Sequence, residues 1–200
     1  MTTTDSIGAL FAPLFKRLDA MLAKSPVILA IEGGSASGKS TLATHLEQAY
    51  DCTVFHMDDF FLRPEQRTPA RFAEPGGNVD RERFLAEVLT PLSRGETVQY
   101  RRFDCGTMTI LPPVSVTPKR LTVVEGAYAT HPAFGAPYGL TVFLDIDPAL
   151  QKKRILARNP DMAGMFFDRW IPMEHAYFEA MNVRSRCDLT IAVKETGETP

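Results

Sequence analysis

Cysteine is scarce in this sequence and shows no pairing. Only three of the 200 residues are cysteine, and no two of them have the C-x-x-C spacing of zinc sites and redox motifs. We therefore predict that Cys52, Cys105 and Cys187 are reduced, buried thiols, which form neither a metal site nor a redox centre.

Long apolar runs and an excess of one charge are also lacking. No window approaches the ~20 apolar residues of a membrane-spanning helix. The apolar N-terminal segment is interrupted by Lys16, Arg17 and Asp19, and it lacks the cleavage site of a secretory signal. Lys and Arg number 22 against 24 Asp and Glu, a balance that argues against a nucleic-acid-coating protein. We expect a cytoplasmic protein whose partners are neither membranes nor nucleic acids.

The remaining composition is that of an ordinary globular domain. Hydrophobic residues make up 44% and charged residues 23% of the chain, with no internal repeat or low-complexity tract, so we predict one domain over residues 1–200. Within residues 1–25, apolar positions recur at three- and four-residue spacing from Ile7 to Leu22, after Asp5 or Ser6 as N-cap. This pattern predicts an amphipathic helix that packs on the domain. A membrane-surface role is the alternative, although the polar face is not notably basic.

Short apolar runs alternate with helical patterns along the rest of the chain. The runs typical of strands buried on both faces are residues 27–31, 53–57, 120–124, 141–146 and 189–193. The segments with helical patterns are residues 40–50, 81–92, 149–158 and 168–181. Residues 97–103 and 107–111 could form a hairpin, whereas proline and glycine before residue 81 predict no regular structure. The alternation predicts a three-layer α/β/α fold around a mainly parallel sheet of five strands.

A glycine-rich segment carries a phosphate-binding motif. The sequence GGSASGKS at residues 33–40 satisfies G-x-x-x-x-G-K-[ST] between a predicted strand and a predicted helix, which is the context that the motif requires. Its backbone N–H groups and the helix N-terminus would bind a polyphosphate. The predicted ATP-binding residues are Gly33, Gly34, Ser35, Ala36, Ser37, Gly38, Lys39, Ser40 and Thr41. Lys39 would contact the β- and γ-phosphates, and Ser40 would ligate Mg²⁺.

The motif alone does not separate kinases from nucleotide-dependent switches and motors. The sequence contains neither the N-K-x-D tetrad that reads guanine nor the L-S-G-G-Q signature of transporters. Their absence argues against a GTPase or a transporter ATPase. A kinase and a slowly hydrolysing switch that acts through a partner both remain open.

Acidic side chains follow two of the predicted strands. Asp58 and Asp59 lie at the strand edge where open α/β sheets bind ligands, and either carboxylate could orient and deprotonate an acceptor hydroxyl. Capping of a loop or helix is the alternative. Glu125 ends another strand, where P-loop proteins keep a magnesium-associated carboxylate. Arg154 and Arg158, four residues apart on one helix face, could stabilise a transferred phosphoryl group or lie at the surface.

Taken together, these segments resemble the uridine kinase-like group of P-loop nucleoside and small-molecule kinases, which includes phosphoribulokinase- and pantothenate kinase-like relatives. The resemblance extends from Val27 to Val193. The motifs that carry it are GGSASGKST, HMDDFF, GGNVDRERF, YRRFD, VVEGAY, VFLDIDPALQKKRILARN and CDLTI. It implies an enzyme that uses ATP and Mg²⁺ to phosphorylate a hydroxyl group of a small molecule, as uridine kinase-like nucleoside kinases do.

The resemblance also implies roles for single residues. It selects Asp58 rather than Asp59 as the catalytic acid, and Asp80 as the acid that holds sugar hydroxyls. It associates Glu125 with Mg²⁺. It makes Arg154 and Arg158 catalytic arginines that lead into a short lid at residues 154–170.

Departures from the uridine kinase pattern concern the acceptor. Phe103 and Met108 stand where those enzymes carry a tyrosine and a histidine that read the pyrimidine, and their apolar side chains argue against uracil. The usual Arg-Gly-Arg of the lid is missing, and Arg169 would replace part of it. The predicted substrate contacts are thus Asp58, Asp80, Phe103 and Arg169. A kinase for a non-nucleoside metabolite, such as a vitamin precursor or sugar derivative, is the alternative. The sequence does not identify the acceptor, does not show whether ATP or GTP is preferred, and does not show whether the protein forms homo-oligomers.

Overall fold

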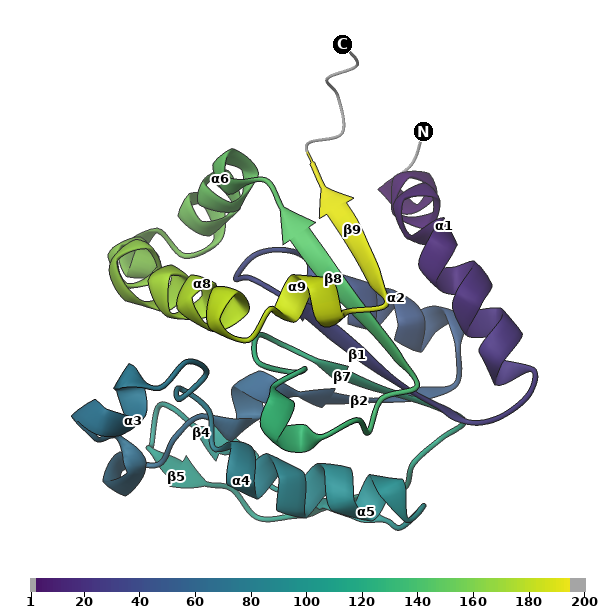
Figure 1. Cartoon of the computed structure of the whole chain (residues 1–200), viewed down its shortest axis with the longest axis horizontal. Coiled ribbons are helices and arrows are strands. Elements are labelled where there is room, and N and C mark those ends of the chain that lie inside the picture. Colours follow the sequence, from purple (N-terminus) through teal and green to yellow (C-terminus); the bar gives the residue numbers. More distant parts are fainter. Residues whose placement is uncertain (1–2, 195–200) are drawn as a thin grey trace.

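The computed structural model describes residues 3–194, with side chains from residue 8 onward (Figure 1). A central sheet of five parallel strands has the order β2-β7-β1-β8-β9. Its strands are β1 (Val27–Gly33), β2 (Cys52–His56), β7 (Leu121–Glu125), β8 (Leu140–Ile146) and β9 (Leu189–Val193). The predicted α/β fold with a five-stranded parallel sheet is therefore confirmed.

Helices cover both faces of the sheet. The longer ones are α1 (Thr3–Leu22), α2 (Lys39–Ala49), α6 (Pro148–Arg158) and α8 (Ile171–Ala180). Figure 1 shows α1 and α2 on one side of the sheet, and α4, α5 and α8 on the other. Because successive strand side chains point to opposite faces, Leu29 and Ile31 of β1 enter the core shared with α1 and α2, whereas Ile28 packs against the opposite core. Two apolar cores on one sheet make the three layers.

The N-terminal helix packs on the sheet through Phe11, Leu14 and Leu18, which are buried in the first core. Asp5 and Ser6 lie inside this helix, so neither is its N-cap and that prediction was wrong. The side chain of Ile7 lies outside the described residues, as do Met1, Thr2 and residues 195–200. No helix within residues 3–194 is long and apolar enough to cross a membrane.

The helix predicted at residues 81–92 is one continuous run with a π-helical middle. It consists of α4 (Arg81–Phe84), η3 (Leu85–Leu89) and α5 (Thr90–Ser93). The helix predicted at residues 168–181 starts earlier than its apolar pattern suggests. That region comprises η5 (Pro160–Met162), α7 (Ala163–Met165), η6 (Phe166–Trp170) and α8, followed by α9 (Val183–Arg186).

The proline-rich stretch before residue 81 does contain regular structure, so that prediction was wrong. Its elements are η1 (Met57–Phe60), η2 (Pro64–Gln66) and α3 (Pro69–Ala73). Pro64 and Pro69 occupy first helical positions, where a missing N–H costs no hydrogen bond. The Thr68 hydroxyl caps α3 by accepting a hydrogen bond from the backbone N–H of Arg71.

The predicted hairpin is present but divided. Its tip pairs β4 (Phe103–Asp104) with β5 (Thr109–Ile110), and β3 (Val98–Tyr100) pairs with β6 (Val114–Val116). A further short helix, η4 (Pro132–Phe134), follows β7. Of the cysteines, Cys52 is buried, but Cys105 at the hairpin tip is exposed, and Cys187 is half-buried. Burial was therefore predicted correctly only for Cys52.

Candidate active site

The glycine-rich loop joins β1 to α2, as predicted. Gly33 has a φ of +147°, and a Cβ on it would lie 2.7 Å from the backbone oxygen of Leu144. Gly38 precedes α2 with a φ of +102°, in the left-handed region that glycine favours. Ser40 and Thr41 lie exposed in the first turn of α2, where helical N–H groups lack intrahelical acceptors. This turn can bind an anion.

Lys39 reaches back across this loop. Its side chain is 9% exposed, and its Nζ donates a hydrogen bond to the backbone oxygen of Gly34 at 2.9 Å. The Ser37 hydroxyl is buried, without a hydrogen-bond partner among the described residues. The loop therefore holds one ammonium group and one unpaired hydroxyl beside the helix N-terminus. Both groups are suited to phosphate oxygens.

Ser40 and Glu125 lie together, as the predicted magnesium site requires. The Ser40 hydroxyl donates to Glu125 Oε1 at 3.1 Å, and His56 Nδ1 lies 2.6 Å from the same oxygen. Parallel pairing of β2 with β7 places His56 opposite Glu125. The hydrogen bond to Glu125 raises the pKa of His56.

The donor set at this edge fits Mg²⁺, which prefers oxygen and usually takes one or two carboxylates together with phosphates and water. Within residues 3–194, no group of three or more His, Cys, Asp or Glu side chains could hold a metal by itself. The ion would therefore be shared between Ser40, Glu125 and the phosphates of a nucleotide.

The two adjacent aspartates have different surroundings. They lie in the 3₁₀ turn η1, which directly follows β2. Asp59 Oδ2 accepts a hydrogen bond from the Tyr100 hydroxyl at 2.5 Å. The Asp58 side chain retains contact with solvent, yet the protein around it displaces enough water to raise its pKa, and the Lys39 ammonium partly offsets this. Asp58 is therefore within electrostatic reach of Lys39 in the phosphate loop.

Asp80 caps α4. Its Oδ1 accepts the backbone N–H of Arg83 at 3.1 Å, and its own N–H donates to the backbone oxygen of Phe60 at 2.7 Å. Its Oδ2 is buried and has no hydrogen-bond partner in the described part of the chain, although Arg63 Nε lies 3.6 Å away. One oxygen of Asp80 thus caps the helix, and the other lies at ion-pair distance from the Nε atoms of Arg63 (3.6 Å) and Arg83 (3.7 Å).

Phe103 and Arg169 are the remaining predicted substrate contacts. Phe103 is buried in β4, with the guanidinium of Arg67 5.8 Å above its ring. Met108 has a φ of +60° at the hairpin tip. Arg169 is exposed on η6, and its guanidinium lies 4.9 Å from the ring centre of Phe72 in α3. Arg169 therefore joins η6 to α3, and among the described residues it has no hydrogen bond or ion pair with Asp58.

The two arginines of α6 also differ. Arg154 Nη1 donates to the backbone oxygen of Ala36 at 3.0 Å, and burial lowers the pKa of this guanidinium. Arg158 is exposed at the end of the helix. Only Arg154 is in contact with the phosphate loop.

Two polar residues at this loop escaped sequence reasoning. Glu174 of α8 accepts hydrogen bonds from the Ser35 N–H at 2.9 Å and the Ser35 hydroxyl at 2.6 Å. Gln151 Nε2 donates to the Ser35 backbone oxygen at 2.8 Å. A Cβ on Gly34 would lie 3.1 Å from Gln151 and 3.3 Å from Glu174. Gln151 could have been found, because it precedes Arg154 by three residues and shares its helix face. Glu174 has no such signal.

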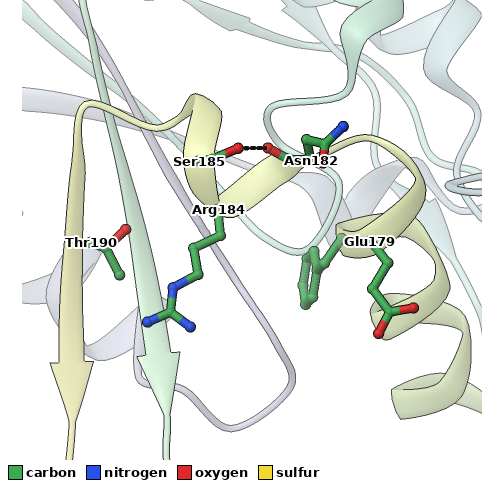
Figure 2. Close-up of a pocket in the computed structure, with 6 residues that line it drawn as sticks. Glu179, Asn182, Arg184, Ser185 and Thr190 are labelled. Carbon is green, nitrogen blue, oxygen red and sulfur yellow. Dashed lines mark hydrogen bonds between the residues drawn. The ribbon is translucent and has the colours of Figure 1, made fainter.

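A cavity of about 390 Å³ lies apart from these residues, beside α8, α9 and β9 (Figure 2). It is lined by Phe178, Glu179, Asn182, Arg184, Ser185 and Thr190. Arg184 is paired with Asp145 at 2.6 Å, and none of the lining residues carries a predicted role. A smaller cavity of about 80 Å³ includes Gly34 and Gln151. The chemical groups for phosphoryl transfer are therefore at the loop and not in the larger cavity.

Comparison with known proteins identifies relatives at modest identity. No family model matches the chain. The uridine kinase of Clostridium perfringens strain 13 is 25% identical over 70% of this chain and 72% of its own length. The uridine kinase of Brevibacillus brevis is 25% identical over 72% of this chain and 71% of its own length. That of Chloroflexus aurantiacus is 28% identical over 67% of this chain and 68% of its own length.

Solved structures share the fold. A possible uridine kinase from Bacillus stearothermophilus superimposes with a TM-score of 0.64 at 20% identity, covering 90% of this chain and 99% of that one. YFH7 from Saccharomyces cerevisiae has a TM-score of 0.60 at 12% identity, covering 94% and 99%. The predicted resemblance to uridine kinases and the P-loop fold are confirmed, and the relatives support the predicted enzyme class, a small-molecule kinase.

Proposed function

We propose that this chain, similar in sequence to uridine kinases, transfers the γ-phosphoryl group of ATP to a hydroxyl group of a small molecule in a Mg²⁺-dependent reaction. The observation that carries the proposal is the grouping of Lys39, Asp58 and the Ser40–Glu125 pair around one helix N-terminus. A switch protein needs the first and third of these groups, but it has no need of a second carboxylate beside the loop.

On the nucleotide side, residues 33–41 bind the phosphates through backbone N–H groups, and Lys39 neutralises charge between the β- and γ-phosphates. Ser40 and Glu125 would hold Mg²⁺, which would neutralise phosphate charge. Arg154, which donates a hydrogen bond to the backbone oxygen of Ala36, would stabilise charge on the phosphoryl group.

On the acceptor side, Asp58 orients the hydroxyl and takes its proton. The acceptor oxygen forms a bond to the γ-phosphorus as the bond between that phosphorus and the bridging oxygen breaks, and ADP leaves. A raised pKa suits Asp58 to this role, because a base whose pKa lies nearer the working pH binds the proton more readily. Asp80 Oδ2, which makes no hydrogen bond in the described part of the chain and lies at ion-pair distance from Arg63 and Arg83, would accept a second hydroxyl of the acceptor.

The relatives' names make a nucleoside the first candidate acceptor. A non-nucleoside metabolite, such as a vitamin precursor or a sugar derivative, is the second candidate. Phe103 favours it, because this side chain is buried and offers no hydrogen bond to a base. We further propose that residues 1–200 form one cytoplasmic kinase domain, with residues 154–170 as its lid.

A coupled assay of ADP release with Mg²⁺ tests the proposal. Nucleosides, vitamin precursors and sugar derivatives are added one at a time, with Lys39→Ala as the inactive reference. We expect ADP release to depend strictly on one class of acceptor. Slow release that no acceptor accelerates would instead indicate the nucleotide-dependent switch.

A further inference from the structure

A fully buried carboxylate lies directly behind the phosphate loop. Glu32, the residue before Gly33, is 0% exposed. Its two oxygens accept hydrogen bonds from the N–H of Gly33 (3.0 Å), Tyr128 (3.0 Å) and Thr130 (3.0 Å) and from the hydroxyls of Thr130 (3.1 Å) and Tyr177 (3.2 Å). Burying a carboxylate is costly unless hydrogen-bond donors replace the water around it. The Glu32 side chain therefore favours the arrangement in which these five N–H and O–H donors point at its oxygens.

These donors come from three parts of the candidate active site. Gly33 begins the phosphate loop, Tyr128 and Thr130 follow the magnesium-side strand β7, and Tyr177 belongs to α8. Glu32 is thus a contact that the nucleotide loop shares with the segment at residues 126–130. Both segments border the place where the γ-phosphate and the acceptor would meet.

The backbone of this segment is strained at Tyr128. Its φ of +75° lies in the left-handed region, which a bulky aromatic residue rarely adopts. The hydrogen bond from its N–H to Glu32 Oε1 holds this conformation. Two residues earlier, Gly126 has a φ of +144°, and a Cβ on it would lie 2.6 Å from that of Met57. The segment is therefore held against the turn that carries Asp58.

The Tyr128 side chain lies among active-site groups. Its ring centre is 4.9 Å from that of Tyr177. Burial raises the pKa of its hydroxyl well above the usual range, and the carboxylates of Glu174, Glu32 and Asp58 raise it further. The hydroxyl therefore lies within electrostatic reach of the proposed base Asp58 and of Glu174, which contacts the phosphate loop.

We propose that Glu32 is a positioning residue that holds the entry of the phosphate loop and the strained backbone of Tyr128 in one arrangement, and that Tyr128 thereby forms a wall of the acceptor site beside Asp58. This inference rests on the proposed kinase function. It gives a reason for a buried acid and for a strained aromatic residue that the reaction itself does not use.

The first test measures binding of a fluorescent ATP analogue, mant-ATP, with Mg²⁺ to the whole chain. In Glu32→Gln, an amide NH₂ group faces N–H and O–H donors, so the loop entry shifts. Leu14→Ala is the matched control, because it destabilises the opposite core without contact to the site. We expect at least 5-fold weaker mant-ATP binding in Glu32→Gln and less than 2-fold in Leu14→Ala, at a temperature where both are folded.

The second test uses Tyr128→Phe, which keeps the ring and removes only the hydroxyl. With the acceptor found in the ADP-release assay, we expect its KM to rise at least 5-fold while the KM for ATP stays within 2-fold. A purely structural role would lower the melting temperature without this split between the two KM values.

The outcomes separate the inference from the function on which it rests. If Glu32→Gln binds mant-ATP like the wild type, or if Tyr128→Phe leaves the acceptor KM unchanged, the positioning role is overturned and the kinase proposal stands. If the wild type binds mant-ATP but no acceptor accelerates ADP release, the kinase proposal is overturned, and the role of Tyr128 is overturned with it.

Discussion

Ser35 donates both its backbone N–H and its hydroxyl to the carboxylate of Glu174, 139 residues later in the chain. Glu174 lies in the first turn of α8 and is only 5% exposed. Burial raises the pKa of this carboxyl, and the Lys39 ammonium and the hydrogen bonds from Ser35 partly offset the effect. The helix α8, which follows the predicted lid in the chain, therefore holds the first turn of the phosphate loop.

Replacing Glu174 by alanine should loosen that turn. The Ser35 N–H would lose its acceptor, and an unpaired buried donor costs roughly 1–3 kcal/mol. We expect the KM for ATP to rise about 10-fold, with a smaller change in kcat, in steady-state ADP-release assays. Glu179→Ala, an exposed site on the same helix, is the control. Tighter ATP binding in Glu174→Ala would mean that the carboxylate opposes the nucleotide instead of supporting its loop.

Removal of the Lys39 ammonium should nearly abolish turnover. Its Nζ lies across the loop on Gly34, whereas the guanidinium of Arg154 is bound to the backbone oxygen of Ala36. Loss of one preorganised electrostatic group costs about 10²–10³-fold in kcat. Lys152→Ala, on the exposed side of α6, should retain wild-type rates. Near-normal kinetics in Lys39→Ala would exclude the phosphate loop from the reaction.

The neighbouring aspartates should respond differently to substitution by asparagine. Asp58→Asn removes the proposed proton acceptor, so kcat should fall about 10²–10⁴-fold while ATP still binds. Asp59→Asn disturbs the hydrogen bond from Tyr100 and should lower the melting temperature more than kcat. Single-turnover kinetics and thermal unfolding of both variants distinguish these effects. Reversed results would assign the base to Asp59.

The arginines of α6 should be separable in the same way. Arg154 contacts Ala36 in the phosphate loop, so Arg154→Ala should lower kcat at least 10-fold. Arg158→Ala removes an exposed side chain, and we expect less than a 3-fold change. Equal losses in kcat would mean that Arg158 also reaches the phosphates when nucleotide is bound.

Glu32 should make stability depend on pH. Burial raises its pKa from 4.5 to about 7, so the folded state binds the proton more tightly than the unfolded state. The stabilisation is then complete below pH 4.5 and is lost as the pH rises through 7. Over that window, the free energy of unfolding should fall by about 3 kcal/mol relative to Glu32→Gln, as measured by urea denaturation. A difference that stays constant with pH would show that Glu32 remains ionised throughout.

The regular part of the fold could be predicted because its determinants are local. The runs that became β1, β7 and β8 are apolar on both faces, and the motif at residues 33–40 lies between a strand and a helix. The capping of α4 by Asp80 was equally local, since an acid before a helix has one obvious donor to accept from.

The irregular elements were predicted less well. The short helix α3 was not predicted, because proline commonly interrupts helices, although Pro69 at its first position is compatible with one. The π-helical segments η3 and η6 have no distinct sequence pattern. Only the packing of their neighbours distinguishes them from α-helix.

By itself, the sequence determined the sheet, the phosphate loop and the acids that follow β2 and β7, because each depends on residues close together in the chain. Tertiary structure alone decided that Glu174 holds Ser35, that Asp59 is bound by Tyr100, and that Arg154 and not Arg158 meets the loop. Those contacts join segments far apart in sequence. Which polar side chains meet across such distances depends on how the helices pack on the sheet, and a local sequence pattern does not predict that packing.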